Sequence, residues 1–394
     1  MLDTTQKGIA VLIRNALLDE KNSLPDTADF GAIVSLAKRH GVLNMTYYGA
    51  LNAGISNEDE LMQGLFIYSC KIVAKSTQQL YELDCIFDAF QKNGINYMPL
   101  KGTVLKKLYP KSDMRPMGDA DILIKPEQYE KIIPIVSALG FESGGESDHE
   151  LIWKKKSLFL ELHKHLIPSY FKDYYAYFGD GWGKAHLTEK STCRYEMSQE
   201  DTFIYLFSHF AKHYRDGGIG IKHLTDIYIY RKKYPQMDDE YIKYELEKLK
   251  LNEFYQNILV LLECLFESEE FDEKSAFIFK VILNSGAFGT SEAKSLSKAV
   301  KASKTAGSAK GGKSRRLRQI FFPSVEAMRK RYPILNKLPV LLPFMWFSRG
   351  LETVFFKNQK LKENMATMKN ITADKIDSYQ QSLLYVGLDY NFKE

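Results

Sequence analysis

Apolar residues recur at helical spacing over two long stretches of the chain, and they form shorter runs between those stretches. The first stretch covers residues 4–90, with breaks around Pro25 and at Gly54. The second covers residues 198–283 and is interrupted at Gly217-Gly218. Apolar positions three and four residues apart place one face of a helix against a core, so both stretches are predicted to be helical.

The intervening region alternates short apolar runs with turn residues, which is typical of a small α/β unit. The pattern predicts strands at 95–100 and 120–124, helices at 103–108 and 127–139, a turn at Gly144-Gly145, and paired strands near 151–155 and 158–163. The predicted fold class is therefore α+β, with a small mixed sheet embedded between helical regions.

A chain of 394 residues is long enough for two to three domains at roughly 100–200 residues each. The predicted segments are a helical N-terminal region at 1–92, an α/β core at 93–197, a helical domain at 198–290, a basic flexible linker at 291–318, and a C-terminal helical and aromatic segment at 319–394. The aromatic run near residues 338–347 is too short to span a bilayer. We expect it to pack onto the domains, with an interfacial membrane anchor as the alternative.

Positive charge is concentrated in the predicted linker. Residues 291–318 hold nine Lys and Arg against one Glu, whereas the whole chain carries a net charge of +5. The remainder is thus slightly acidic, which argues against a duplex-binding protein. Any weak contact with nucleic acid or an anionic membrane is expected through 291–318. The N-terminus lacks a signal-peptide pattern and no 18-residue apolar stretch occurs, so a cytoplasmic protein is expected.

Three acidic residues are the main candidates for chemistry. Asp119 and Asp121 stand two positions apart at the start of a predicted strand, so both side chains project from one face. Glu161 lies between two leucines on a neighbouring strand and can add a third carboxylate to that face. Oxygen ligands of this kind suit Mg²⁺, or Mn²⁺ in its place.

A turn for binding phosphate is predicted just before these carboxylates. Gly102-Thr103 ends a strand and begins a helix, where free backbone N–H groups favour an anion. Lys101 and Arg115 flank the site, and the planar fork of Arg115 matches a phosphate group. An exposed, purely structural role is the alternative for Arg115.

The order of these motifs resembles the DNA polymerase beta-like nucleotidyltransferase superfamily. Leu100-Lys-Gly and Arg115-Pro-Met-Gly-Asp-Ala-Asp-Ile-Leu-Ile are similar to a bacterial family usually called uncharacterised nucleotidyltransferases. The resemblance implies that Gly102 and Thr103 hold the triphosphate and that Asp119, Asp121 and Glu161 bind the metals. Lys101 and Thr103 depart from the superfamily pattern, which prefers an apolar residue and Gly or Ser at these positions.

Several later residues are candidates for the acceptor side of the site. His163 follows Glu161 on the same strand face and is expected to support the carboxylates. The resemblance implies that His209, His213 and Asp226 line the cleft, with ordinary helix packing as the alternative. His209 and His213 are one helical turn apart, but no Glu follows the first His, which excludes a zinc-protease motif.

The sequence thus predicts an enzyme that transfers a nucleoside monophosphate from a nucleoside triphosphate such as ATP to a hydroxyl acceptor and releases pyrophosphate. The acceptor can be a small molecule, a protein side chain or an RNA end. A non-catalytic nucleotide-binding or regulatory protein on the same fold is one alternative. A partner in polysaccharide or membrane-associated biosynthesis is another.

Overall fold

The computed structural model describes residues 1–147, 149–306, 322–355 and 371–390. The chain divides into two compact units. The first comprises residues 1–212 and 219–288, and it contains the sheet; the second comprises 213–218 and 289–390. The predicted division into five segments remains a proposal about how the chain is organised.

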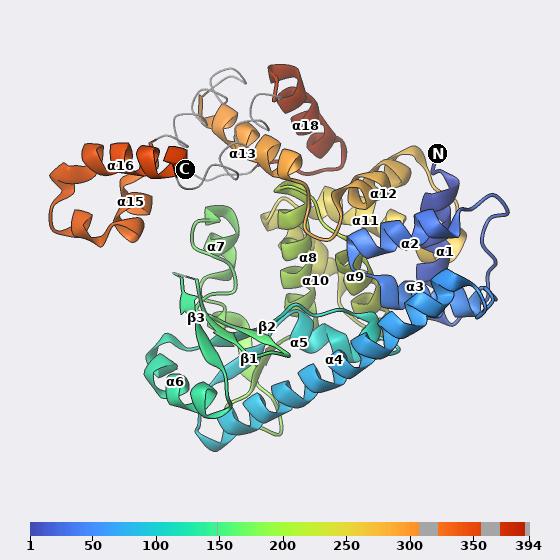
Figure 1. The fold of residues 1–394 in the computed structure, drawn as a ribbon, viewed down its shortest axis with the longest axis horizontal. Helices are drawn as coiled ribbons and strands as arrows, with labels where there is room; N and C mark the ends of the chain where they lie inside the picture. The colour runs from blue at the N-terminus through green and yellow to red at the C-terminus, as the bar shows by residue number, and fades with distance from the viewer. Residues whose placement is uncertain (148, 307–321, 356–370, 391–394) are drawn as a thin grey trace. The chain divides into compact units, whose positions relative to one another are not determined.

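The N-terminal part of the first unit is helical, as predicted. Its helices are α1 (Thr4–Leu18), α2 (Phe30–His40), α3 (Leu43–Asn52) and the long α4 (Glu60–Lys92) (Figure 1). Asp3, Asp29 and Asp59 precede α1, α2 and α4, and each carboxylate accepts a hydrogen bond from backbone N–H groups of the first turn. These caps satisfy donors that the helix itself leaves free.

A five-stranded mixed sheet follows, which confirms the α+β class. Its strands are β1 (Tyr97–Pro99), β2 (Asp119–Ile124), β3 (Glu142–Glu146), β4 (Glu150–Lys154) and β5 (Phe159–His163), in the spatial order β1-β2-β5-β4-β3. β2 and β5 are parallel, and the other neighbouring pairs are antiparallel. The short α5 (Gly102–Leu105) follows β1, and α6 (Tyr129–Ala138) follows β2.

The two faces of the sheet differ in polarity. Ala120, Ile122 and Ile124 of β2 point to one face and join a fully buried apolar cluster with residues of α4 and α6. Asp119 and Asp121 alternate with them and therefore occupy the opposite face. Burial of the apolar face fixes the register of the strands, because a slip by one residue would expose the core positions. The same register places the acidic residues.

The prediction of a turn at Gly144-Gly145 is wrong. Both glycines lie inside β3, where the pairing with β4 shifts between Ser143 and Gly145. A Cβ on Gly144 would come within 2.9 Å of Ile152 Cγ2, and Gly145 has φ +113°. These glycines therefore permit a β-bulge and close contact between strands rather than a reversal of the chain.

The helical period after residue 198 is also confirmed. α7 (Lys172–Phe178) and a small ribbon of β6 (Ala185–Leu187) and β7 (Tyr195–Met197) come first, and the sequence pattern had not indicated that ribbon. The later helices are α8 (Gln199–Arg215), α9 (Ile221–Lys233), α10 (Asp239–Lys248), α11 (Asn252–Glu263) and α12 (Glu273–Ser285).

The first part of the predicted basic linker is instead a helix, α13 (Ser291–Ala306), in the second unit. Leu296, Ala299 and Val300 are buried on one face of it, and α13 packs against α18 (Ala373–Tyr385). Three apolar positions at helical spacing were enough to bury one face, although charged residues surround them. The rest of the predicted linker, 307–318, lies outside the described residues.

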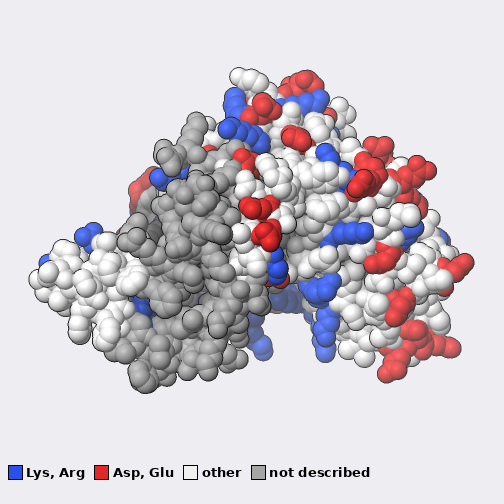
Figure 2. Space-filling model, turned by 90° about the horizontal axis from the view of Figure 1, so that it is seen from above, with Lys and Arg blue, Asp and Glu red and all other residues white. Residues whose placement is uncertain are grey.

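The remaining helices of the second unit are α15 (Val325–Arg331) and α16 (Leu342–Phe355). Within this segment Trp346 donates a hydrogen bond to the carbonyl of Pro323, while Phe344 and Phe347 are exposed. Among the described residues, no helix is both long and apolar enough to cross a membrane. On the face shown in Figure 2, basic (blue) and acidic (red) side chains lie interspersed among the other described residues (white).

Candidate functional site

Asp121 and Glu161 are direct neighbours on the polar face of the sheet. The register of the parallel strands β2 and β5 pairs Asp121 with Glu161 and Asp119 with Phe159. Asp119 is exposed at the beginning of β2, whereas Asp121 is buried. The three predicted carboxylates therefore lie on one face, as their spacing indicated.

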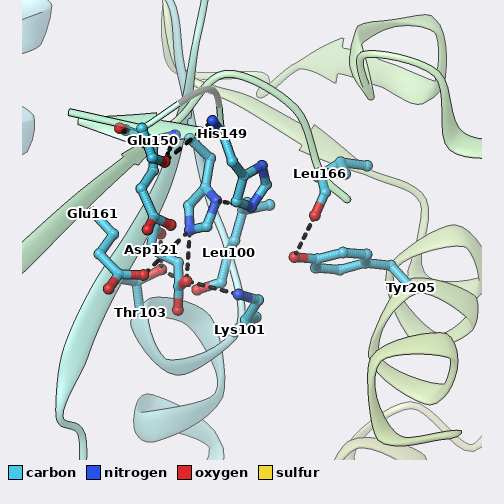
Figure 3. Close-up of polar contacts among 11 residues, drawn as sticks. Leu100, Lys101, Thr103, Asp121, His149, Glu150, Glu161, Leu166 and Tyr205 are labelled. Atoms are coloured by element: carbon cyan, nitrogen blue, oxygen red, sulfur yellow. Dashed lines mark hydrogen bonds and ion pairs between the residues drawn. The ribbon is translucent and has the colours of Figure 1, made fainter. Parts of the chain in front are cut away.

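One oxygen of Asp121 holds two nitrogen donors. Lys101 Nζ and His163 Nε2 each lie 2.7 Å from Asp121 Oδ1 (Figure 3). Among the described residues, no hydrogen bond is made to Asp121 Oδ2. Asp121 thus has one oxygen engaged within the protein and one oxygen available to a ligand.

The charges around Asp121 reinforce one another. Burial by itself raises the pKa of Asp121, but the Lys101 ammonium and the hydrogen bond from His163 outweigh it and hold the pKa well below its ordinary value. Burial likewise opposes the charge on Lys101, and attraction to Asp121 outweighs that effect and raises the pKa of Lys101. Both groups are therefore charged at neutral pH.

Glu161 behaves in the opposite way. Its burial and the neighbouring carboxylates of Asp119, Asp121 and Glu150 raise the pKa of Glu161 to about 8. A carboxyl that binds its proton this tightly lacks enough positive charge nearby. A divalent cation beside Glu161 would supply that charge.

The donor atoms suit such a cation. Asp121, Glu161 and His163 each offer one ligand atom, and these atoms lie within 4.8 Å of one another. Two carboxylates match Mg²⁺ or Mn²⁺, while His163 Nε2 engages Asp121 Oδ1 and orients that carboxylate. Asp119 is exposed on the same face of β2, two positions from Asp121.

The turn at Gly102-Thr103 lies next to this group but differs from the expectation for Thr103. The Thr103 N–H and hydroxyl both donate to the carbonyl of Leu100, at 3.1 and 2.6 Å. Thr103 therefore stabilises the turn from inside, and its donors are not directed at a ligand. A Cβ on Gly102 would lie 2.8 Å from Arg115 Nη1 and 3.2 Å from Met117 Cγ, so a larger residue would have to displace these side chains.

Lys101 has an unusual backbone conformation. Its φ of 44° and ψ of −115° lie in a region of backbone conformation that residues other than glycine rarely adopt. In this conformation the Lys101 ammonium pairs with Asp121. Strain of this kind occurs preferentially at functional positions.

The guanidinium group of Arg115 is directed at Asp226 and not at a phosphate site. Its Nε and Nη2 bind the two oxygens of Asp226 at 2.7 and 2.9 Å, and both side chains are buried. The hydroxyl of Tyr109 donates to Asp226 at 2.8 Å. The predicted phosphate ligand and the predicted cleft residue are thus partners of each other, which the sequence could not show because 110 residues separate them.

Two residues beside the site were not predicted. His149 Nε2 lies 3.0 Å from His163 Nδ1, and Glu150 is the register partner of His163 across β4 and β5. Burial lowers the pKa of His149 to about 3, so its imidazole is neutral. The position of both residues depends on the register of β4 against β5, which the local sequence does not specify.

Helix α8 supplies a further neighbour. Tyr205 of α8 is buried beside Lys101, and burial raises the pKa of Tyr205 to about 12, although the ammonium lowers it. One turn later, the His209 ring stands 6.5 Å from the Tyr205 ring, between their centroids. His213 belongs to the second unit, where its carbonyl accepts a hydrogen bond from Gly218. His209 and His213 thus lie one turn apart on α8, and the boundary between the two units falls between them.

Comparisons with known proteins identify the family of this chain. No curated protein matches the chain. The solution structure of the antibiotic-resistance factor ANT(2'')-Ia aligns over 48% of this chain and 96% of its own, at 14% identity and a TM-score of 0.32, too low to support an argument. A family profile described as "Uncharacterised nucleotidyltransferase" matches residues 26–267, which is more than half of the chain and includes the whole sheet. The chain therefore belongs to the family of uncharacterised nucleotidyltransferases.

Proposed function

We propose that this protein is a metal-dependent nucleotidyltransferase that moves a nucleoside monophosphate from a nucleoside triphosphate to a hydroxyl acceptor and releases pyrophosphate. Family membership supports nucleotidyl transfer in general. The observation that carries the specific proposal is the pairing of Asp121 with Glu161 on adjacent parallel strands, on the face that also bears Asp119.

Asp119, Asp121 and Glu161 are the residues that would hold Mg²⁺ or Mn²⁺. When bound, such an ion neutralises charge on phosphate oxygens and lowers the barrier to in-line displacement. The protein supplies the geometry. Lys101 and His163 keep Asp121 ionised and fix its orientation through the two 2.7 Å contacts with Oδ1.

The turn at Gly102 is the proposed place for the triphosphate. Arg115 Nη1 stands close beneath Gly102, and Lys101 adjoins it, so two cations flank the turn. Positive charge at this position favours an anion. Asp226 binds Nε and Nη2 of Arg115, so Arg115 would contribute its positive charge beside the turn and not a two-pronged contact with phosphate.

The test is transfer of label from α-labelled nucleoside triphosphates to separate small-molecule, protein and RNA fractions, with pyrophosphate release measured in parallel. We expect activity with Mg²⁺ or Mn²⁺ in the wild-type chain and none in Asp119→Asn or Asp121→Asn. Asp84→Asn is the matched control, since Asp84 is an exposed carboxylate on α4 that pairs at the surface with Lys107. Equal activity in all four proteins would refute the proposal.

A second candidate function is nucleotide binding without turnover. It is favoured by the Lys101 ammonium, which contacts the same carboxylate that would bind the metal. A cation fixed in that place competes with a metal ion for Asp121. On this view the wild-type chain binds nucleotide without divalent ions and releases no pyrophosphate. Lys101→Met then strengthens Mn²⁺ binding, while in an enzyme it lowers turnover by removing a cation near the triphosphate.

A further inference from the structure

A second group of potential metal ligands, which shares His163 with the first, lies where β4 begins and β5 ends. His149 and Glu150 stand at the beginning of β4, and His163 ends β5. The strand register places Glu150 opposite His163, and Lys164 N–H donates to the carbonyl of His149 at 2.8 Å. One ligand atom from each of His149, Glu150 and His163 lies within 4.8 Å of the other two.

The distance between the two imidazoles fits joint coordination of one ion. His149 Nε2 and His163 Nδ1 are 3.0 Å apart. Zinc–nitrogen bonds of about 2.0–2.1 Å in a tetrahedral site hold two nitrogens about 3.3 Å apart, so a shift of a few tenths of an ångström would suffice. The two rings meet edge to face, at 68° between their planes.

Asp121 gives His163 the tautomer that a metal ligand needs. His163 Nε2 lies 2.7 Å from Asp121 Oδ1, and a carboxylate oxygen at this distance accepts a hydrogen from that nitrogen. His163 Nδ1 then presents a lone pair towards His149 and Glu150. A carboxylate that accepts a hydrogen bond from the second nitrogen of a metal-bound histidine is the usual arrangement around protein zinc ions.

We propose that His149, Glu150 and His163 form a binding site for a transition-metal ion of the zinc type. Two imidazoles and one carboxylate favour Zn²⁺ or Co²⁺ over Mg²⁺, which prefers oxygen. The site is therefore separate in its chemistry from the carboxylates that would hold Mg²⁺. It goes beyond nucleotidyl transfer and does not depend on it.

Such an ion would connect the start of β4 to the end of β5 and fix the ring of His163 against Asp121. Without it, the same 3.0 Å contact is a hydrogen bond between two imidazoles. The two possibilities differ in one measurable property, namely whether a cobalt ion acquires histidine ligands.

The test is titration of Co²⁺ into the full, tag-free chain in excess Mg²⁺, which occupies the sites made only of carboxylates. We expect a visible absorption band that saturates at one ion per chain. The band should be lost in His149→Ala and in Glu150→Gln, the second of which preserves size and is expected to preserve the fold. Asp121→Asn should weaken Co²⁺ binding about 10- to 100-fold, the usual effect of losing such a supporting carboxylate.

The matched control is His186→Ala, because the side chain of His186 is exposed on β6, where Glu196 lies within ion-pair distance at 3.8 Å. It should leave the band unchanged. A band that persists in both His149→Ala and Glu150→Gln, or no band in the wild-type chain, would overturn the proposal. Circular dichroism establishes which variants are folded, and Glu150→Gln decides the matter if His149→Ala is not.

Failure of this site is distinguishable from failure of the proposed enzyme activity. Asp119 is not part of the histidine cluster, so Asp119→Asn should abolish pyrophosphate release and retain the cobalt band. A chain that binds Co²⁺ through His149 but never releases pyrophosphate would refute the enzyme and leave the metal site intact.

Discussion

Arg115 and Asp226 form a buried, two-pronged ion pair between the segment before β2 and helix α9. The two contacts measure 2.7 and 2.9 Å, and the side chains are 5% and 6% exposed. Burial by itself lowers the pKa of Arg115. Attraction to Asp226 outweighs that effect, so the pKa of Arg115 is raised. The pair connects helix α9 to the segment that leads into β2, the strand that carries Asp119 and Asp121.

Removal of one partner of this pair should be costly. We expect Asp226→Asn to lower the free energy of unfolding by about 3–5 kcal/mol, because it leaves the Arg115 charge buried without a counterion. Urea unfolding followed by circular dichroism measures it. The exposed pair of Lys107 and Asp84 is the control, and Asp84→Asn should change stability by about 1 kcal/mol at most. Similar losses in the two variants would contradict a special role for burial.

Glu161→Gln should reduce turnover much more than nucleotide affinity. The amide keeps the size of the side chain but removes the charge that would hold a cation, and cation stabilisation of a transition state is worth several kcal/mol, on the order of 10²- to 10³-fold in rate. Steady-state kinetics give kcat, and equilibrium titration with a fluorescent nucleotide gives affinity. If Glu161→Gln stays fully active while Asp119→Asn is inactive, Glu161 has no part in the site.

Binding of Mn²⁺ should strengthen as the pH rises towards 8. The pKa of Glu161 is raised to about 8, so below that pH a metal ion must displace a proton, and affinity falls about tenfold per pH unit. Above pH 8 the carboxylate is already ionised and the affinity should level off. Calorimetric titration of Mn²⁺ across this range tests the sign. Glu161→Gln should show a flatter dependence; a wild-type profile that is flat, or that falls with pH, would assign the metal to other residues.

Truncation of the apolar face of α13 should destabilise the second unit. Leu296 is 9% exposed, and Leu296→Ala should cost about 2 kcal/mol or more through lost burial and the cavity left behind. Lys294→Ala, at an exposed position of the same helix, should change stability by no more than about 0.5 kcal/mol. Thermal unfolding compares them. Equal stability of the two variants would mean that α13 is held by something other than its apolar face.

Local patterns in the sequence were sufficient for the N-terminal helices, for the strands that carry the site and for the carboxylates. A period of two places Asp119 and Asp121 on one face of a strand, and flanking leucines place Glu161 on the next. These relationships hold within a few residues, and the apolar residues between them can be buried in only one way. The α+β class and the acidic face of the sheet follow directly.

Contacts between distant segments were decided by the tertiary structure alone. Nothing near Arg115 in the chain indicates that Asp226 occupies its fork, and nothing near Lys101 indicates that its ammonium lies on Asp121. The bulge at Gly144-Gly145 and the buried face of α13 also depend on partners elsewhere in the chain.

The physical reason is that a charged side chain in the core must find a counterion, whereas its sequence neighbours specify only that it is charged. Which counterion it meets depends on how strands and helices pack, and packing is set by the apolar residues. The sequence therefore determined which groups are available for chemistry. The tertiary structure decided that Lys101 and His163 both contact Asp121, and that His149 contacts the other ring nitrogen of His163.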